Sequence, residues 1–362
     1  MTADTVGGVW TYAVELIRAL GDLGVEVALA TMGKNLDSDQ KRQICSLRNA
    51  ELFESRYKLE WMKDSWEDVD LSGEWLAAIA QCLRPDVVHL NGYSHGALSF
   101  NAPVIITAHS CVYSWFESVK KEAPEKAVWE EYHKRVSEGL SACDYVVAPT
   151  RFMLDSLSRL YGISFRGKVI HNGREGTRLV PRIKDPIVLT AGRLWDEAKN
   201  ITALESVARQ LPWKVYAAGD GLDHVKGGAI HWLGKCAPSV LASWMSRTSV
   251  YALPAKYEPF GLSVLEAALC GCALVLGDIP SLRELWEDCA MFVEPGDTDQ
   301  LQSTVLTFID QPWLRREYGE RAKRRALQFT PEKMARAYVQ LYTELLNSRN
   351  ELRGPQERTL CA

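Results

Sequence analysis

Short runs of β-branched and other apolar residues alternate with amphipathic segments along most of this 362-residue chain. We expect buried strands at 25–30, 87–90, 104–107, 145–148 and 168–170, and then at 187–191, 214–218, 230–233, 250–253, 273–276 and 291–293. Helical periodicity lies between them at 9–20, 74–83, 125–140 and 150–160, and then at 200–209, 239–246, 263–269 and 298–309. This alternation predicts an α/β protein with parallel sheets covered on both faces by helices.

The alternation stops once, in a stretch that contains two glycines, two prolines and several charges but little apolar periodicity. This stretch, residues 173–186, is typical of a linker. We therefore expect an N-terminal Rossmann-like domain at 1–172 and a second one at 187–330, each long enough for its own core. A last segment, 331–362, begins with a Thr-Pro-Glu helix-start signal and holds a helix and a tail.

The first glycine loop, Gly7-Gly8, follows only six residues, and Met1–Val6 is short and polar for a buried strand. Either the first strand is very short, or the true start lies upstream. Two glycines at a helix start let backbone amides approach an anion, although a tight turn explains them equally well.

Composition excludes several classes of protein. The formal net charge of -4 gives no sign of a nucleic-acid binder. No apolar stretch is long enough to span a membrane, and no signal peptide is evident, so the cytoplasm is the expected location. The nine cysteines include no Cys-x-x-Cys pair, which favours buried free thiols over disulfides or a zinc site.

Polar residues just after predicted strands are the candidate site residues, because open parallel sheets bind ligands at the carboxyl ends of their strands. His109 follows the strand at 104–107, although a lone histidine is more often structural. Arg193 follows the strand at 187–191, and Lys199 comes six residues later at a helix start. Two cations placed in this way predict a diphosphate clamp rather than a pair of solvated surface charges.

Two glutamates give the most specific signal. Glu258 lies in the loop after the strand at 250–253, and Glu266 lies on the helix that follows. Carboxylates near a helix start can hold the vicinal hydroxyls of a ribose or a hexose. Glu266 is surrounded by apolar residues, where a free charge is costly unless it is paired, so two unrelated surface glutamates are a poor explanation.

These residues together resemble the retaining glycosyltransferases of group 1, also called family four, which have the GT-B fold of two Rossmann-like domains facing across a cleft. The segment Glu258-Pro-Phe-Gly-Leu-Ser-Val-Leu-Glu266 is similar to the family's paired-glutamate motif. Arg193 with Lys199 resembles its diphosphate-binding pair, and His109 its active-site histidine. The resemblance extends from Gly7 to the C-terminal helix, which is expected to return to the N-terminal domain.

The resemblance implies a role for each residue. Arg193 and Lys199 would hold the donor diphosphate and stabilise the leaving group, and Glu266 would bind the donor ribose. Glu258 would contact the transferred sugar and its phosphate, and His109 would lie near the reacting carbon. Backbone groups at Gly8, Phe260, Gly261 and Leu262 would contact the donor. The acceptor-side candidates are Gly7, Asn91, Tyr93 and Ser110.

The implied reaction is transfer of a sugar, most simply a hexose, from a nucleoside-diphosphate sugar to a carbohydrate or other hydroxyl acceptor. Front-face attack, in which the acceptor arrives on the side from which the diphosphate leaves, needs no protein nucleophile. We expect no required metal, because the Asp-x-Asp pairs at 68–70 and 297–299 lie in polar connecting segments. The basic residues at 315–325 predict a solvated helix face, with membrane contact as the minor interpretation.

Two other classes remain open at this stage. A GT-B nucleotide-sugar epimerase or hydrolase would need its own acid–base pair, and none is evident beyond His109. A catalytically silent nucleotide-sugar-binding protein is the third hypothesis, suggested by the abbreviated N-terminus. The donor base, the sugar and the acceptor are not encoded in any transferable motif.

Overall fold

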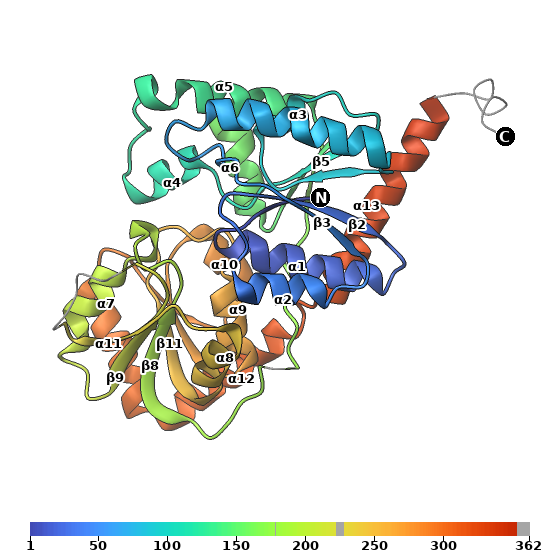
Figure 1. Ribbon diagram of the computed structural model, residues 1–362. Coiled ribbons are helices and arrows are strands. Elements are labelled where there is room, and N and C mark those ends of the chain that lie inside the picture. The colour runs from blue at the N-terminus through green and yellow to red at the C-terminus, as the bar shows by residue number, and fades with distance from the viewer. Residues whose placement is uncertain (178, 222–227, 353–362) are drawn as a thin grey trace. The chain divides into compact units, whose positions relative to one another are not determined.

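The computed structural model describes residues 1–177, 179–221 and 228–352, and the chain divides into two compact units (Figure 1). Unit 1 comprises Met1–Ser114, Pro124–Gly173 and the chain from Pro331 onward. Unit 2 comprises Trp115–Ala123 and Arg174–Thr330. The main chain therefore passes from one unit to the other after Ser114, Ala123, Gly173 and Thr330, and each unit is described by itself below.

Unit 1 is built on short parallel strands. Three of them pair in the order β1-β2-β3, and four more pair in the order β4-β5-β6-β7. The side-chain amide of Asn91 donates to the carbonyl oxygen of Thr2 at 2.6 Å, which joins the end of β4 to β1. The strands are β1 (Thr2–Asp4), β2 (Val27–Met32), β3 (Ala50–Glu54), β4 (Val88–Leu90), β5 (Val104–Thr107), β6 (Tyr145–Ala148) and β7 (Gly167–Val169).

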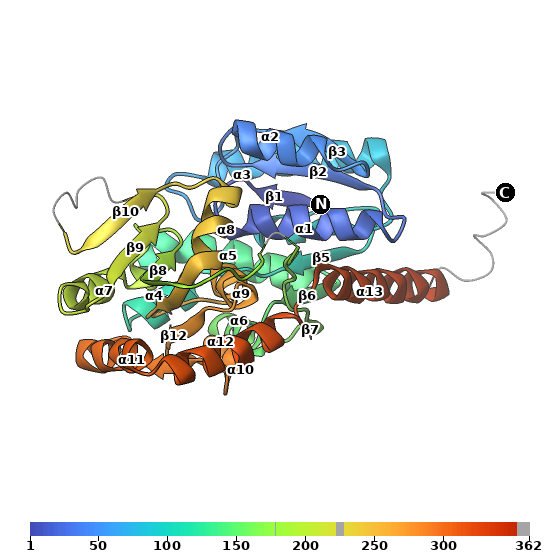
Figure 2. The same cartoon turned by 90° about the horizontal axis from the view of Figure 1, so that it is seen from below.

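Helices cover both faces of these strands. The apolar sides of α1, α2 and α13 form one core cluster, with α13 packed along α1 (Figures 1 and 2). The helices α5 and α6 pack with β4, β5 and β6 in a second cluster. The helices are α1 (Gly8–Gly21), α2 (Ser38–Cys45), α3 (Trp66–Leu83), η1 (Ser94–Ala97), α4 (Val112–Val119), which continues into unit 2, α5 (Lys126–Ala142), α6 (Arg151–Tyr161) and α13 (Pro331–Leu352).

Unit 2 contains one six-stranded parallel sheet in the order β10-β9-β8-β11-β12-β13. Alternate residues of each central strand face opposite cores: Val250 and Ala252 pack in one cluster, and Tyr251 and Leu253 in the other. Two faces buried in this way explain the continuous apolar runs of the sequence. The strands are β8 (Asp185–Ala191), β9 (Lys214–Ala218), β10 (Ile230–Gly234), β11 (Thr248–Leu253), β12 (Ala273–Gly277) and β13 (Met291–Val293).

The helices of unit 2 divide between the two faces of this sheet. Apolar residues of α7 and α11 belong to one core cluster and those of α8, α9 and α10 to the other, while α12 contributes to both. The helices are η2 (Glu197–Lys199), α7 (Ile201–Ala208), α8 (Pro238–Arg247), α9 (Leu262–Leu269), α10 (Pro280–Trp286), α11 (Thr298–Asp310) and α12 (Pro312–Ala326). Both units are thus doubly wound α/β domains, which confirms the expected fold class.

Some sequence expectations need correction. The strand β1 exists and is only three residues long, and β3 was missed because two of its five residues are exposed glutamates. The expected linker ends before Asp185, since Pro186 already belongs to β8. Helix α3 begins at Trp66 rather than 74, because Glu67 and Asp68 supply a favourable acidic first turn.

The acidic and basic surface segments have structural explanations. Asp68 and Asp70 lie within helix α3, not in a connecting segment, and Asp70 pairs with Arg135. Asp297 caps the start of α11 by accepting from the backbone N–H of Gln300 at 2.8 Å. In α12, Arg316 pairs with Glu320 at 3.0 Å, one helical turn away, as expected for a solvated helix face.

The cysteines are more varied than the sequence suggested. All eight in the described part of the chain are free thiols. Cys111, Cys270 and Cys272 are buried as expected, but Cys45 and Cys82 are exposed, because each lies near the end of a surface helix. Cys361 lies outside the described residues. Over the described ranges, no helix is both long and apolar enough to cross a membrane.

Candidate active site

The strand order of unit 2 reverses between β8 and β11, and ligands of open α/β sheets bind at the carboxyl edge of such a switch point. The loop after β8 carries Arg193 and leads through η2 to Lys199, while the loop after β11 carries Glu258. The backbone N–H of Lys256 donates to the carbonyl oxygen of Ala198 at 2.8 Å, which holds the two loops together. The switch point therefore gathers three of the candidate residues.

Lys199 and Glu258 form an ion pair with a separation of 2.6 Å between Nζ and Oε2. Their side chains are only 11% and 13% exposed. Largely buried charges are stable when they are paired, and removal of one partner leaves the other at a high energetic cost. The two loops thus hold a cation and a carboxylate ready at the same position.

Arg193 lies at the more open side of the same loop. Its Nη2 atom lies 3.0 Å from Oδ2 of Asp196, and its guanidinium stacks over the indole of Trp195, with 5.5 Å from Cζ to the ring centroid. The other carboxylate oxygen of Asp196 accepts from Trp115 Nε1 and from the backbone N–H of Ala198, each at 3.0 Å. The buried Asp196 therefore orients an otherwise accessible arginine fork.

Glu266 lies on the second turn of α9 and pairs with Arg174, at 2.6 Å between Oε1 and Nε. The side chains are 12% and 20% exposed, so the requirement that a carboxylate among apolar residues be paired is met. Sequence reasoning placed Arg174 in the linker and missed this role. The need of Glu266 for a cation was the available signal, but the sequence does not show which cation supplies it.

The turn between the two glutamates depends on Gly261, which precedes α9 with φ of 85°. A Cβ atom at this position would lie 3.1 Å from Cγ2 of Val264 and 3.3 Å from Cγ of Glu258. Glycine therefore supplies both the left-handed backbone and the space that brings Glu258 close to the helix start. Phe260 is buried against Phe329, and Leu262 is the first residue of α9.

Two further residues of unit 2 support these loops and were not singled out from the sequence. The hydroxyl of Tyr251 lies 2.8 Å from Oγ of Ser263, and it lies 3.1 and 3.2 Å from the carbonyl oxygen and the backbone nitrogen of Ala191. These contacts link β11 and the end of β8 to α9. Ser281 donates to the carbonyl oxygen of Glu258 at 2.6 Å. Both residues lie in apolar surroundings, where nothing in the sequence pattern marks a polar contact.

In unit 1, His109 follows β5 and lies against Asn91, with 2.8 Å between Nε2 and Oδ1. Because the amide nitrogen of Asn91 donates to Thr2, its oxygen must face the histidine, and His109 Nε2 must be the donor. Burial lowers the pKa of His109 to about 3, so the ring is neutral near pH 7. Its Nδ1 atom is then an acceptor suited to a hydroxyl group.

A buried polar network fixes the surroundings of His109. The ring of Tyr12 meets the imidazole edge-on, with 4.5 Å between centroids, and its hydroxyl donates to that of Tyr338 at 2.6 Å. His89 lies 2.8 Å from Thr107 through Nε2 and 2.7 Å from the hydroxyl of Tyr342 through Nδ1. Helix α13 thus supports the position of His109 through α1.

The remaining candidates of unit 1 divide into two pairs. Gly7 caps α1 with φ of 83°, and Gly8 is its exposed first residue. Tyr93 is buried, and its hydroxyl donates to the carbonyl oxygen of Ser110 at 2.9 Å. Tyr93 therefore shapes the wall of the site, whereas the exposed Ser110 is open to a ligand.

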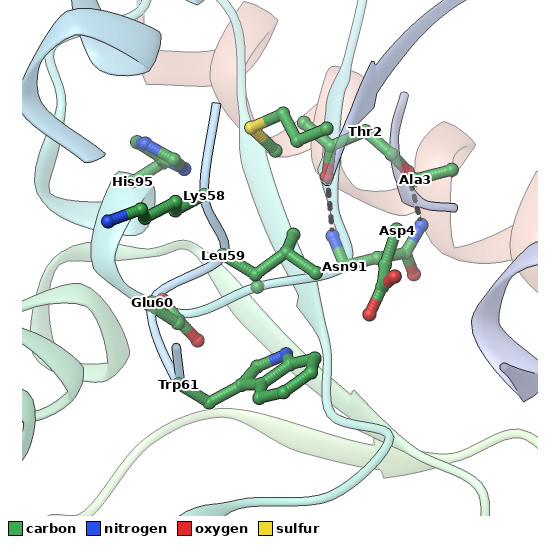
Figure 3. Close-up of a pocket in the computed structure, with 11 residues that line it drawn as sticks. Thr2, Ala3, Asp4, Lys58, Leu59, Glu60, Trp61, Asn91 and His95 are labelled. Carbon is green, nitrogen blue, oxygen red and sulfur yellow. Dashed lines mark hydrogen bonds between the residues drawn. The ribbon is translucent and has the colours of Figure 1, made fainter. Parts of the chain in front are cut away.

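A small hollow of about 50 Å³ opens beside Asn91 (Figure 3). Figure 3 shows Asp4, Glu60 and Trp61 around it, with Leu59 beside them. It lies at the carboxyl ends of β1 and β4, where the two sheets of unit 1 meet through Asn91. In the described part of the chain, no three His, Cys, Asp or Glu side chains gather in a way that could hold a metal ion.

The buried histidines of unit 1 predict acid sensitivity. Burial lowers the pKa of His109 to about 3, and it also lowers the pKa values of His89 and His95. Unfolded histidines titrate near pH 6.5, so between this pH and the folded pKa the unfolded chain binds more protons, and stability falls as the pH falls. At pH 5, His109 alone should destabilise the fold by about 2 kcal/mol relative to pH 7.5.

Denaturant unfolding between pH 5 and 6.5 measures this effect. His109→Asn should reduce the average slope of unfolding free energy against pH by about 1 kcal/mol per pH unit over this range, approaching the one-proton value of about 1.4 near pH 5. The exposed His231, replaced in the same way, is the matched control. An unaltered slope in His109→Asn would show that this histidine is not held neutral by the fold.

Comparison with known proteins places this geometry in a family. Residues 6–175 match the family model described as Glycosyltransferase Family 4, and residues 185–311 match the one described as Glycosyl transferases group 1. Glycogen synthase of Mycobacterium tuberculosis is 28% identical over 307 residues, covering 76% of this chain and 72% of that protein.

Solved structures agree on the fold. Sucrose-phosphate synthase of Thermosynechococcus elongatus superposes with a TM-score of 0.80 at 21% identity, covering 95% of this chain and 94% of the other. Anabaena HepE in complex with UDP-glucose gives 0.74 at 17% identity, with 95% and 96% covered. The two α/β units therefore form the GT-B fold of glycosyltransferase enzymes. The chain belongs to the group 1 glycosyltransferases.

Proposed function

We propose that this glycosyltransferase moves a hexose from a nucleoside-diphosphate sugar to an acceptor hydroxyl with retention of anomeric configuration. The observation that carries the proposal is the cluster at the switch point of unit 2, where Lys199, Glu258 and Arg193 lie on two linked loops. The similar fold of HepE, solved in complex with UDP-glucose, supports a nucleotide sugar as the donor.

The side chains of unit 2 fit the needs of a departing diphosphate. Arg193 supplies a planar fork for phosphate oxygens and Lys199 a point charge, so together they neutralise charge as the bond between the anomeric carbon and the phosphate oxygen breaks. Glu258 accepts from hydroxyls of the transferred sugar. Glu266, oriented by Arg174, holds the ribose of the nucleotide.

In the proposed front-face reaction, the acceptor oxygen bonds to the anomeric carbon on the side from which the diphosphate leaves. The acceptor proton passes to a diphosphate oxygen, so the protein supplies positioning and electrostatic stabilisation rather than a nucleophile. His109 serves as a neutral hydrogen-bond acceptor for a substrate hydroxyl through Nδ1, a role its lowered pKa favours.

Incubation with a panel of nucleotide sugars, followed by proton NMR of the products, tests this function. We expect transfer, or slow hydrolysis without acceptor, with the anomeric configuration of the donor kept in the first-formed product. An inverted product would contradict the front-face mechanism. Formation of an epimer, or binding without turnover, would instead support the epimerase or the silent binding protein.

Metal independence is a separate proposal. Arg193 and Lys199 supply the positive charge that a divalent cation supplies elsewhere, so turnover should persist within about twofold in excess chelator. The measurement is the initial rate of nucleoside diphosphate release with and without chelator, with added manganese or magnesium as the control. Loss of activity on chelation, restored by either cation, would show that the two side chains are insufficient.

A further inference from the structure

The hollow of unit 1 lies at a position where α/β sheets bind ligands. Strands β1 and β4 are the first strands of the two sheets of unit 1, which the Asn91 side chain joins, and both end at the hollow, through Asp4 and Asn91. The segment Lys58–Trp61 also lines the hollow (Figure 3). Ligands of parallel α/β sheets bind beyond the carboxyl ends of the strands, so the place of the hollow favours a binding site.

Asn91 connects the hollow directly to His109. The residue lines the hollow, and its Oδ1 atom accepts from His109 Nε2 at 2.8 Å. A molecule held in the hollow therefore contacts the side chain that fixes the tautomer of the proposed active-site histidine. This link places the hollow on the acceptor side of the reaction, and the inference rests on the proposed function.

The hollow presents an aromatic face among polar groups. Trp61 is 36% exposed, whereas the neighbouring Leu59 is buried. An exposed indole beside hydrogen-bonding side chains suits the apolar face of a sugar ring, whose hydroxyls the polar groups then bind. A volume of about 50 Å³ is too small to enclose a hexose, so the hollow receives one edge of a ring.

The charges around the hollow are unfavourable for phosphate. The Lys58 ammonium donates to the carbonyl oxygens of Lys63 and Asp64, at 3.4 and 3.0 Å. Among the described residues that line the hollow, Lys58 is the sole lysine or arginine, and these bonds direct its N–H donors to backbone carbonyls. The other charged groups are the carboxylates of Asp4 and Glu60, which repel an anion and accept from hydroxyls.

Glu60 holds one wall in place. Its carboxylate accepts from the backbone N–H groups of Tyr93 and Ser94, at distances of 2.8 to 3.1 Å. This contact fixes the segment that carries Trp61 against the start of η1. Asp4, which accepts from the backbone N–H of Val6, is half-buried like Glu60 and lies at the end of β1.

From this combination we propose that the hollow binds an edge of a neutral, hydroxyl-rich ring of the acceptor and disfavours an acceptor that carries a phosphate there. Trp61 supplies the stacking face and Asp4 accepts from ring hydroxyls. Asn91 contacts both the ring and His109, so the bound ring lies next to the residue that orients this histidine. The start of α1, close after Asp4, favours an anion, so a phosphorylated acceptor is the competing outcome.

Acceptor kinetics test this proposal with matched pairs of probes. Glucose and maltose are compared with glucose 6-phosphate and maltose 1-phosphate, using whichever nucleotide sugar the wild type consumes. We expect kcat/KM to be at least tenfold higher for the neutral acceptors. Trp61→Ala should raise the acceptor KM at least tenfold with the donor KM within twofold, and Trp61→Phe should keep most of the wild-type efficiency. Trp313→Ala, which removes an exposed indole in α12, is the matched control.

Asp4→Asn tests the contribution of the carboxylate charge. It should reduce the ratio of kcat/KM for the neutral acceptors to kcat/KM for the phosphorylated acceptors. Saturation-transfer NMR measures maltose binding without turnover. It therefore tests the hollow even if the wild type consumes no nucleotide sugar, a result that would contradict the proposed function but not the proposed binding site. The maltose signal should disappear in Trp61→Ala. Preference for phosphorylated probes, or an unchanged maltose signal and acceptor KM in Trp61→Ala, would overturn the proposal.

Discussion

Lys199→Ala is expected to lower kcat/KM for sugar transfer by about two to three orders of magnitude, the range typical when one preorganised electrostatic group is lost at a developing negative charge. The reason is position: the ammonium is held between two loops at the switch point, largely out of water, where its charge is poorly screened. Steady-state kinetics with the best donor measure the effect, and calorimetry with the nucleoside diphosphate measures the loss of binding.

The substitution also leaves Glu258 without its partner, so folding must be separated from chemistry. An unpaired, largely buried carboxylate costs about 3–5 kcal/mol. The double variant Lys199→Ala/Glu258→Gln removes this charge and should recover thermal stability but not activity. Lys256→Ala is a control expected to keep near wild-type kinetics. Lys256 lies in the loop that carries Glu258 and is paired with Glu197 at 3.4 Å. Wild-type diphosphate affinity in Lys199→Ala would remove this lysine from the donor site.

The sequence was sufficient to predict the architecture because the signals that build it are local. Buried strands such as Val104–Thr107 and Lys214–Ala218 are continuous apolar runs, and their predicted bounds agree with the structure. Elements without such a run were missed. The edge strand β3 carries two exposed glutamates, and the three-residue β1 is joined to β4 through Asn91, a contact distant in sequence.

Partners of the site residues were the part that the sequence could not supply. The positions of Lys199 and Glu258 followed from their places after strands, but their pairing depends on the contact between two loops separated by many residues. Arg174 looked like a linker residue because its neighbours are polar. The hollow beside Asn91 was also beyond reach, since Trp61 lies in a segment with no regular structure and shows its exposure only in the fold.

The two glutamates should differ in the sign of their effect on nucleotide binding. Glu266→Gln is expected to weaken nucleoside diphosphate affinity about tenfold to a hundredfold, since a hydrogen bond to a charged group contributes about 1.5–3 kcal/mol. The substitution removes one of the two carboxylate oxygens, which together can accept from Arg174 and from ribose hydroxyls at the same time. An amide in the same place directs N–H donors at one of these partners.

Glu258→Gln should instead leave diphosphate affinity unchanged or raise it, because the substitution releases the Lys199 ammonium from its 2.6 Å ion pair and makes its charge available to phosphate. Transfer should still fall, by at least tenfold, since the proposed partner of Glu258 is the sugar and not the nucleotide. Calorimetry with uridine, guanosine and adenosine diphosphates, followed by transfer rates with the matching sugars, separates the two effects. Equal losses of diphosphate affinity in both variants would mean that the two carboxylates serve the same part of the donor, and the division of roles between them would be wrong.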